Sequence, residues 1–135
     1  WLDAKPGQKI LDIGSGSGWT TALLAHIAGK KGKVYAVEVV PDLVEFGRNN
    51  VERIGITNAE VHNAGTVFGL REQAPYDRIL VSASAQTLPN ELLDQLKVGG
   101  KLIIPVKNDI LEISKTGKNT CKSVTHPGFV FVPLV

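Results

Sequence analysis

Short apolar runs alternate along this chain with longer stretches whose apolar residues recur at helical spacing. The apolar runs cover residues 9–13, 33–37, 59–62, 78–81 and 101–106. The stretches of helical spacing cover residues 19–28, 41–54 and 89–96, while residues 65–73 indicate a loop with one helical turn. Short runs favour strands and the longer periodic stretches favour helices. This alternation predicts an α/β fold whose parallel strands are joined by right-handed crossovers.

The second helical stretch has recognisable start and stop signals. Pro41 suits the first turn of a helix, acidic Asp42 favours its N-terminus, and Gly55 is placed to end it. Its expected buried face is apolar and consists of Leu43, Val44, Phe46, Val51 and Ile54.

The pattern changes after residue 106. Residues 110–114 and 129–134 are apolar enough for strands, and polar, turn-rich sequence separates them. Because no helix fits between them, we expect the two to pair as an antiparallel hairpin at a sheet edge.

Three glycines follow the first predicted strand at alternating positions, and the first predicted helix begins directly after them. They are Gly14, Gly16 and Gly18. Glycine reaches backbone angles that a Cβ forbids, and it lets a ligand lie against the main chain. A strand, a glycine turn and a helix are typical of α/β proteins that hold a nucleotide-like ligand at the carboxyl ends of their strands.

Composition indicates one ordinary globular domain over residues 1–135. The chain is 43% hydrophobic and 21% charged, with 15 basic and 13 acidic residues. Its densest basic cluster is Lys30, Lys31 and Lys33, at a predicted helix end where cations are favourable. No aromatic residues interleave with these lysines, so we expect no nucleic-acid partner.

The chain also lacks the signatures of metal sites and membrane spans. A single cysteine, Cys121, excludes an intrachain disulfide, and His26, His62 and His126 have no ligand-like spacing. No apolar run approaches the roughly 20 residues that cross a bilayer. We expect a cytoplasmic protein that does not bind membranes. Because the sequence contains no methionine, we also expect it to begin inside a longer protein.

Two acidic residues accompany the glycine turn. Asp12 lies two residues before Gly14, and Glu38 follows the second predicted strand. Adjacent parallel strands end side by side, so Glu38 should face the turn and accept hydrogen bonds from ribose hydroxyls. Asp12 should accept from turn amides or from a cationic ligand group. The alternatives are that Asp12 only fixes the turn and that Glu38 is only a helix-entry acid.

The glycine spacing discriminates between ligand classes. A dinucleotide site has the pattern Gly-x-Gly-x-x-Gly, whereas here the third glycine, Gly18, comes one residue early and an acid precedes the turn. An acid followed by Gly-x-Gly-x-Gly resembles the first motif of the class I methyltransferases. Their cofactor, S-adenosylmethionine, carries a sulfonium and an amino group, both of which suit a nearby acid.

Further segments resemble one family within that class, the protein-L-isoaspartate O-methyltransferases. They are Pro6–Trp19, Ala74–Ala85, Leu88-Pro89, Leu96–Val106 and the terminal Phe131-Val132-Pro133-Leu134. The resemblance spans nearly the whole chain. It implies a Rossmann-like class I fold that holds S-adenosylmethionine, with a mostly parallel sheet, flanking helices and an antiparallel C-terminal edge hairpin.

The same resemblance implies a function and a site. The reaction would transfer a methyl group to the α-carboxyl of L-isoaspartyl residues in damaged proteins, by a monomeric enzyme. The implied cofactor-binding residues are Asp12, Gly14, Ser15, Gly16, Gly18, Glu38, Val39, Ala64 and Gly65. The catalytic hydroxyl is expected upstream of Trp1. We place Ser82 and Ser84 at the crevice wall, without a nucleophilic role.

Two positions depart from the family pattern. The acid expected after the third strand is missing from residues 62–66. Either Asn63 or a backbone carbonyl takes over the adenine contact, or adenine binds more weakly. Asp109 follows the fifth strand where the family often has glutamine. Trp19 and Tyr76 are expected in the core, with adenine stacking as the alternative.

Three other functions compete with this interpretation. Another class I methyltransferase, for example one acting on tRNA, would have a similar first motif, but near-balanced charge disfavours it. A module that binds S-adenosylmethionine without catalysis is the second. An NAD-dependent dehydrogenase is the weakest, because its glycine spacing differs.

Overall fold

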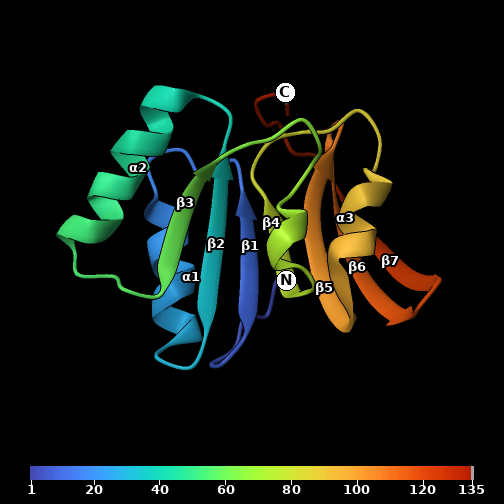
Figure 1. Ribbon diagram of the computed structural model, residues 1–135. Helices are drawn as coiled ribbons and strands as arrows, with labels where there is room; N and C mark the ends of the chain where they lie inside the picture. The colour runs from blue at the N-terminus through green and yellow to red at the C-terminus, as the bar shows by residue number, and fades with distance from the viewer. Residues whose placement is uncertain (135) are drawn as a thin grey trace.

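A computed structural model describes residues 1–134 as one seven-stranded sheet flanked by helices (Figure 1). The strands are β1 (Lys9–Ile13), β2 (Lys33–Glu38), β3 (Ala59–Asn63), β4 (Tyr76–Val81), β5 (Leu96–Val106), β6 (Asp109–Gly117) and β7 (Thr120–Pro127). The helices are α1 (Trp19–Ala28), α2 (Pro41–Arg53) and α3 (Asn90–Gln95), with a short 3₁₀ turn at Arg71–Gln73.

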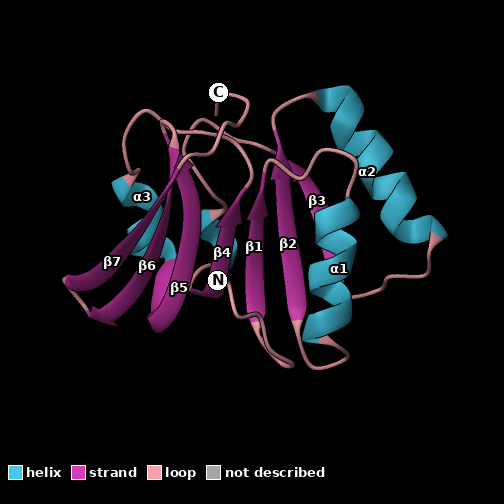
Figure 2. Ribbon diagram, turned by 180° about the vertical axis from the view of Figure 1, so that it is seen from behind, coloured by secondary structure: helices cyan, strands magenta, loops and turns pink. Residues whose placement is uncertain are grey.

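The sheet order, β3-β2-β1-β4-β5-β6-β7, explains how the helices are distributed. From β1 the chain moves outward through β2 to β3, then returns to add β4 on the other side of β1. With right-handed crossovers, the two directions put their helices on opposite faces. Accordingly α3 lies in front of the sheet in Figure 1, while α1 and α2 cover the opposite face in Figure 2. The predicted mixed sheet, mostly parallel, is confirmed.

Helix α2 turns a different face to the core from the one expected. Val44 and Val51 are buried as predicted, whereas Leu43, Phe46 and Ile54 are 37%, 50% and 61% exposed. The third buried residue is Gly47, whose missing side chain lets the helix approach the glycine turn. A Cβ on Gly47 would lie only 2.8 Å from a carbonyl oxygen of that turn. This close backbone contact decides which face of the helix is buried.

The predictions for the two aromatic residues had different outcomes. Tyr76 is fully buried in the largest hydrophobic cluster, as expected. The prediction for Trp19 was wrong, because its side chain is 69% exposed on the outer face of α1. Helix α1 instead buries Leu24, Ala25 and Ala28 against the sheet, small and medium side chains that allow close packing.

The C-terminal hairpin exists, but its second strand differs from the prediction. Strand β6 pairs with β7, which lies in the polar sequence that was interpreted as a turn region. Strand β7 forms the edge of the sheet and exposes nearly all of its side chains, so it shows no apolar run.

Residues 129–134, expected to be that second strand, instead run back toward the loop after β4. The Ser84 N–H donates to the carbonyl of Val132 at 2.7 Å, and the Leu134 N–H donates to the carbonyl of Ser84 at 2.8 Å. The segment therefore pairs with the loop after β4, and its apolar side chains are exposed or only half-buried. No helix among residues 1–134 is long and apolar enough to cross a membrane.

Candidate functional site

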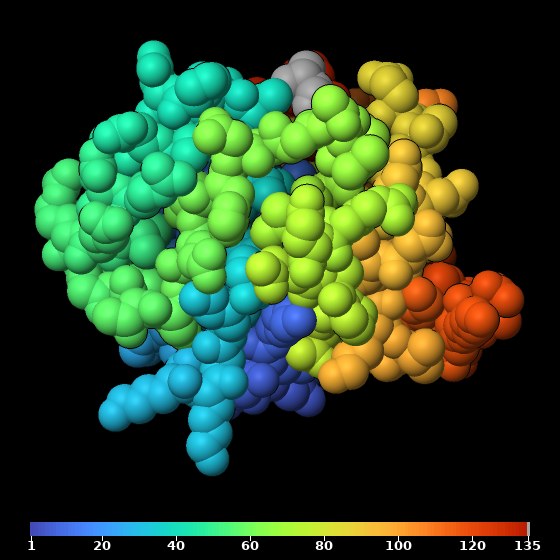
Figure 3. Space-filling view, in the orientation of Figure 1, coloured from blue at the N-terminus to red at the C-terminus, as the bar shows by residue number. Residues whose placement is uncertain are grey.

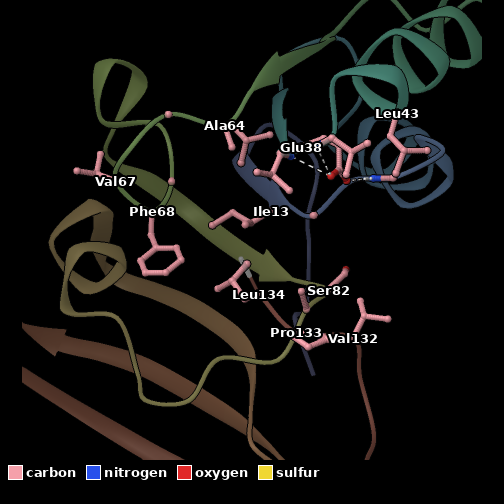
Figure 4. Close-up of a pocket in the computed structure, with 18 of the residues that line it drawn as sticks. Ile13, Glu38, Leu43, Ala64, Val67, Phe68, Ser82, Val132, Pro133 and Leu134 are labelled. Carbon is pink, nitrogen blue, oxygen red and sulfur yellow. Dashed lines mark hydrogen bonds between the residues drawn. The ribbon is translucent and has the colours of Figure 1, made fainter.

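A cleft of about 510 Å³ lies at the carboxyl ends of β1, β2 and β4. These strand ends are at the top of the sheet in Figure 1, and in the space-filling view of Figure 3 the green segment after β3 lies over the upper centre of the molecule. The walls of the cleft come from the glycine turn, the start of α2, the loops after β3 and β4, and the C-terminal segment. Figure 4 shows side chains from these segments surrounding the cleft. This volume lies in the range of roughly 300–1,000 Å³ that is typical of small-molecule sites.

The three glycines of the turn have different roles. All have positive φ angles, 78° at Gly14, 53° at Gly16 and 85° at Gly18, which explains why glycine stands there. Gly14 and Gly16 line the cleft. Gly18 lies outside the lining, and a Cβ there would be 2.9 Å from the carbonyl oxygen of Gly47. The third glycine therefore serves helix packing.

Glu38 ends β2 and faces the turn across the cleft, as the spacing predicted (Figure 4). One carboxylate oxygen accepts the backbone N–H of Gly16 at 2.8 Å. The other accepts those of Val39 and Val40 at 2.9 and 3.1 Å. The side chain is only 7% exposed. A carboxylate has about four lone-pair sites, so acceptor capacity remains for a ligand hydroxyl.

Asp12 lies behind the turn and does not line the cleft. It is fully buried, and one of its oxygens accepts the hydroxyl of Thr21 at 2.7 Å. Burial raises the pKa of the Asp12 carboxyl from 3.8 to about 6, and the Thr21 hydrogen bond opposes this rise. Its second oxygen has no hydrogen-bond partner among the described residues.

Ser15, the residue after the first glycine, also stands behind the turn. It is 7% exposed, and its hydroxyl has no partner in the described part of the chain. The hydrogen bond between Asp12 and Thr21 was not predicted from the sequence. Nothing in the pattern at nine-residue separation points to such a bond.

The loop after β3 forms one wall. Ala64 and Gly65 of this loop line the cleft, as does Val39 directly after β2, and all three were named from the sequence. The four residues that follow also line it, although no motif indicated them: they are Thr66, Val67, Phe68 and Gly69. Asn63, considered for the adenine contact, is exposed at the end of β3 and lies outside the lining.

The opposite wall comes from Ser82 and Ala83 after β4 and from Val132, Pro133 and Leu134 (Figure 4). The three C-terminal residues were assigned to an edge strand in the sequence analysis, so their part in the site was missed. Their apolar side chains after a turn-rich region were the available signal.

Several candidate polar residues lie away from the cleft. The hydroxyl of Ser84 donates to the carbonyl of Lys107 at 2.8 Å, and His26 is exposed on α1. His62 lies 3.3 Å from Glu60 at the outer edge of the sheet. Among residues 1–134, no three histidine, cysteine or acidic side chains are grouped so that they could hold a metal ion.

A family model matches residues 1–135, and its description is protein-L-isoaspartate(D-aspartate) O-methyltransferase. A Pyrococcus horikoshii protein-L-isoaspartate O-methyltransferase is 44% identical over 98% of this chain and 62% of its own length. The Methanococcoides burtonii enzyme of that name is also 44% identical, over 99% of this chain and 68% of its own length. The chain thus spans about 62% of the first of these relatives.

Solved structures agree with the sequence relatives. A Plasmodium falciparum protein described as a protein-L-isoaspartate O-methyltransferase, in complex with S-adenosyl-L-homocysteine, matches with a TM-score of 0.86 and 32% identity. The match covers 98% of this chain and 67% of that one. A second protein-L-isoaspartate O-methyltransferase matches over the whole chain and 44% of its own, with a TM-score of 0.89 and 27% identity.

Proposed function

This chain belongs to the protein-L-isoaspartate(D-aspartate) O-methyltransferase family, and on that premise we propose what its cleft binds and does. The cleft holds S-adenosylmethionine. The protein that contains it methylates the α-carboxylate of L-isoaspartyl residues in damaged proteins and peptides.

The arrangement of Glu38 carries the cofactor assignment. In a dinucleotide site, the free amides of the glycine turn bind phosphate. Here the Gly16 amide already donates to the Glu38 carboxylate, and that negative charge would repel a phosphate. A ligand with ribose hydroxyls and no phosphate fits this surface, because the carboxylate can accept those hydroxyls.

The remaining walls suit the other parts of the cofactor. Val39, Val67 and Phe68 add apolar side chains to the lining of the cleft, which suits a flat adenine ring. The glycine turn leaves room for the methionine end close to the backbone. The Plasmodium falciparum relative, crystallised with S-adenosyl-L-homocysteine, supports the same assignment.

The reaction mainly requires that the methyl donor and the acceptor carboxylate are held in the right positions. Bound S-adenosylmethionine supplies an electrophilic methyl group, which passes from its sulfur to a carboxylate oxygen of the acceptor. That carboxylate is already a nucleophile, so the protein needs no strong base, and alignment accounts for much of the rate. Val132 and Leu134 add apolar surface to the cleft wall at this edge. The Ser84 hydroxyl is engaged by Lys107, so we give it no catalytic role.

We further propose that the enzyme acts in the cytoplasm as a monomer and binds neither nucleic acid nor membranes. Near-balanced charge, 15 basic against 13 acidic residues, supports the absence of a nucleic-acid partner. Light scattering after size-exclusion chromatography tests the monomer, and cell fractionation tests the location.

Methyl transfer to an isoaspartyl peptide and to its normal aspartyl twin is the deciding assay, with the protein in its natural full length. Transfer to the isoaspartyl peptide alone supports the proposal, and transfer to tRNA alone would contradict it. Calorimetry with S-adenosylhomocysteine and with NAD tests the cofactor separately. Comparable binding of NAD would overturn the assignment from Glu38.

A further inference from the structure

Gln95, the last residue of α3, is a buried polar side chain that the sequence analysis did not single out. It is only 2% exposed, yet all its polar atoms are used. Its amide oxygen accepts the backbone N–H of Leu70 at 2.9 Å. Its NH₂ group donates to the carbonyls of Phe68 at 2.8 Å and Glu91 at 3.0 Å. A helix side chain thus replaces backbone partners for the loop after β3.

The loop and the amide approach each other so closely that the sequence of the loop is constrained. Gly69 has a φ of +87°, a conformation that side chains disfavour, and a Cβ there would clash with the Gln95 amide oxygen. A side chain at this position would therefore displace either the Gln95 amide or the loop. Tyr76 adds a second tie, because its hydroxyl donates to the carbonyl of Leu70. Both polar groups of the Leu70 backbone are thus held by buried side chains.

The segment held in this way is the cleft wall formed by residues 64–69, all of which line the cleft. Ala64 is tied to β2 through its N–H, which donates to the Glu38 carbonyl at 2.9 Å. Within the described chain, no backbone hydrogen bond connects residues 65–69 to the sheet. The wall is consequently fixed at its start by β2 and at its end by Gln95 and Tyr76.

We propose that Gln95 is a positioning residue that sets the cofactor affinity of the cleft by holding Phe68 and Leu70 in place. The inference rests on the proposed function for the identity of the ligand. The hydrogen bonds of Gln95 all go to the loop and to its own helix, and Gln95 does not line the cleft, so it acts through Phe68, which does. Loss of its hydrogen bonds to the loop would leave the Leu70 N–H and the Phe68 carbonyl without these partners unless the loop moves toward water.

The test replaces Gln95 by methionine, which has similar length and no strong hydrogen-bonding group. A second variant, Y76F, removes only the hydroxyl that binds Leu70. Ile110→Val is the control. Leu111 packs in the cluster that contains Phe68 and Leu70, and neighbouring residues of a strand point to opposite faces. Ile110 is therefore buried on the face of the sheet away from the loop. This substitution should lower stability without touching the loop.

We expect Q95M to weaken binding of S-adenosylhomocysteine about tenfold in calorimetry below the unfolding transition, and Y76F to weaken it in the same direction. In the full-length enzyme, the KM for S-adenosylmethionine should rise while kcat at saturation stays near the wild-type value. Ile110→Val should leave affinity unchanged. A Q95M protein that is less stable but binds with wild-type affinity would overturn the proposal.

Hydrogen exchange separates this inference from the proposed function. Backbone amides of residues 65–70 should exchange faster in Q95M than in wild type without any ligand, and unchanged exchange would overturn the proposal. Failure of the wild-type protein to bind S-adenosylhomocysteine would instead contradict the proposed function, while the exchange result would still decide whether Gln95 holds the loop.

Discussion

Replacing Glu38 by glutamine tests the site most directly, because this carboxylate holds the glycine turn and faces the cleft at once. Its oxygens accept three backbone N–H groups, from Gly16, Val39 and Val40. Glutamine keeps the length of the side chain but exchanges one acceptor oxygen for an NH₂ donor. Whichever way the amide turns, at least one backbone N–H loses its acceptor in a site that is only 7% exposed.

We expect E38Q to lower the free energy of unfolding by about 1–3 kcal/mol, the cost of an unsatisfied buried donor. Its affinity for S-adenosylhomocysteine should fall by a similar amount, roughly fivefold to a hundredfold, because charge-assisted bonds to ribose are lost. Urea denaturation measures the first quantity and calorimetry the second. The matched control is E45Q, the same chemical change at an exposed position on α2, which should leave affinity unchanged.

A ligand without ribose hydroxyls shows whether Glu38 affects affinity by contacting ribose or by holding the glycine turn. The 2′,3′-dideoxy analogue of S-adenosylhomocysteine should bind wild-type protein more weakly, and E38Q should then cause little further loss. An unchanged affinity of E38Q for the natural ligand would refute the ribose contact. An equal loss for both ligands would also refute it, and would show that Glu38 acts only through the Gly16 amide.

Three further predictions concern stability. Because the folded pKa of Asp12 is raised from 3.8 to about 6, wild-type stability should fall relative to D12N as pH rises from 4 to 6, by about 2 kcal/mol in urea titrations; a constant difference would contradict this. Thr21→Val removes the hydrogen bond that opposes the rise, so the same titrations should show the Asp12 pKa moving higher still. G18A should lower the free energy of unfolding by at least about 1–2 kcal/mol, because of the positive φ and the contact with Gly47. Trp19→Ser, at an exposed position, should change it by no more than about 0.5 kcal/mol. Equal urea midpoints for these two variants would contradict the assigned roles.

The strands and helices up to β4 were predictable because their signals are local. Residues 9–13 form a strand and residues 19–28 a helix with the predicted bounds, since an apolar run, glycines and a periodic stretch follow one another directly. Strand β7 was not predictable in the same way. It is an edge strand whose backbone pairs only with β6, so most of its side chains need not be apolar.

The residues of the cleft also differ in how far the sequence predicts them. Gly14, Gly16 and Glu38 were placed together because parallel strands end at one edge and their spacing is short. Val132 and Leu134 reach the cleft only through hydrogen bonds with Ser84, about fifty residues away. Gln95 is a similar case, since a helix-terminal glutamine gives no sign of the loop it holds. Contacts that depend on long-range register leave no local pattern to detect.

Asp12 and Glu38 look alike in the sequence, two acids beside a glycine turn, yet their surroundings give them different tasks. Glu38 keeps a face toward the cleft and is satisfied by backbone amides, which suits a carboxylate that stays charged. Asp12 is sealed behind the turn with one hydroxyl partner, which favours its protonated form and joins β1 to α1 through Thr21. The acid of the first motif therefore joins the elements on either side of the turn from behind, whereas the acid at the end of β2 faces the cleft.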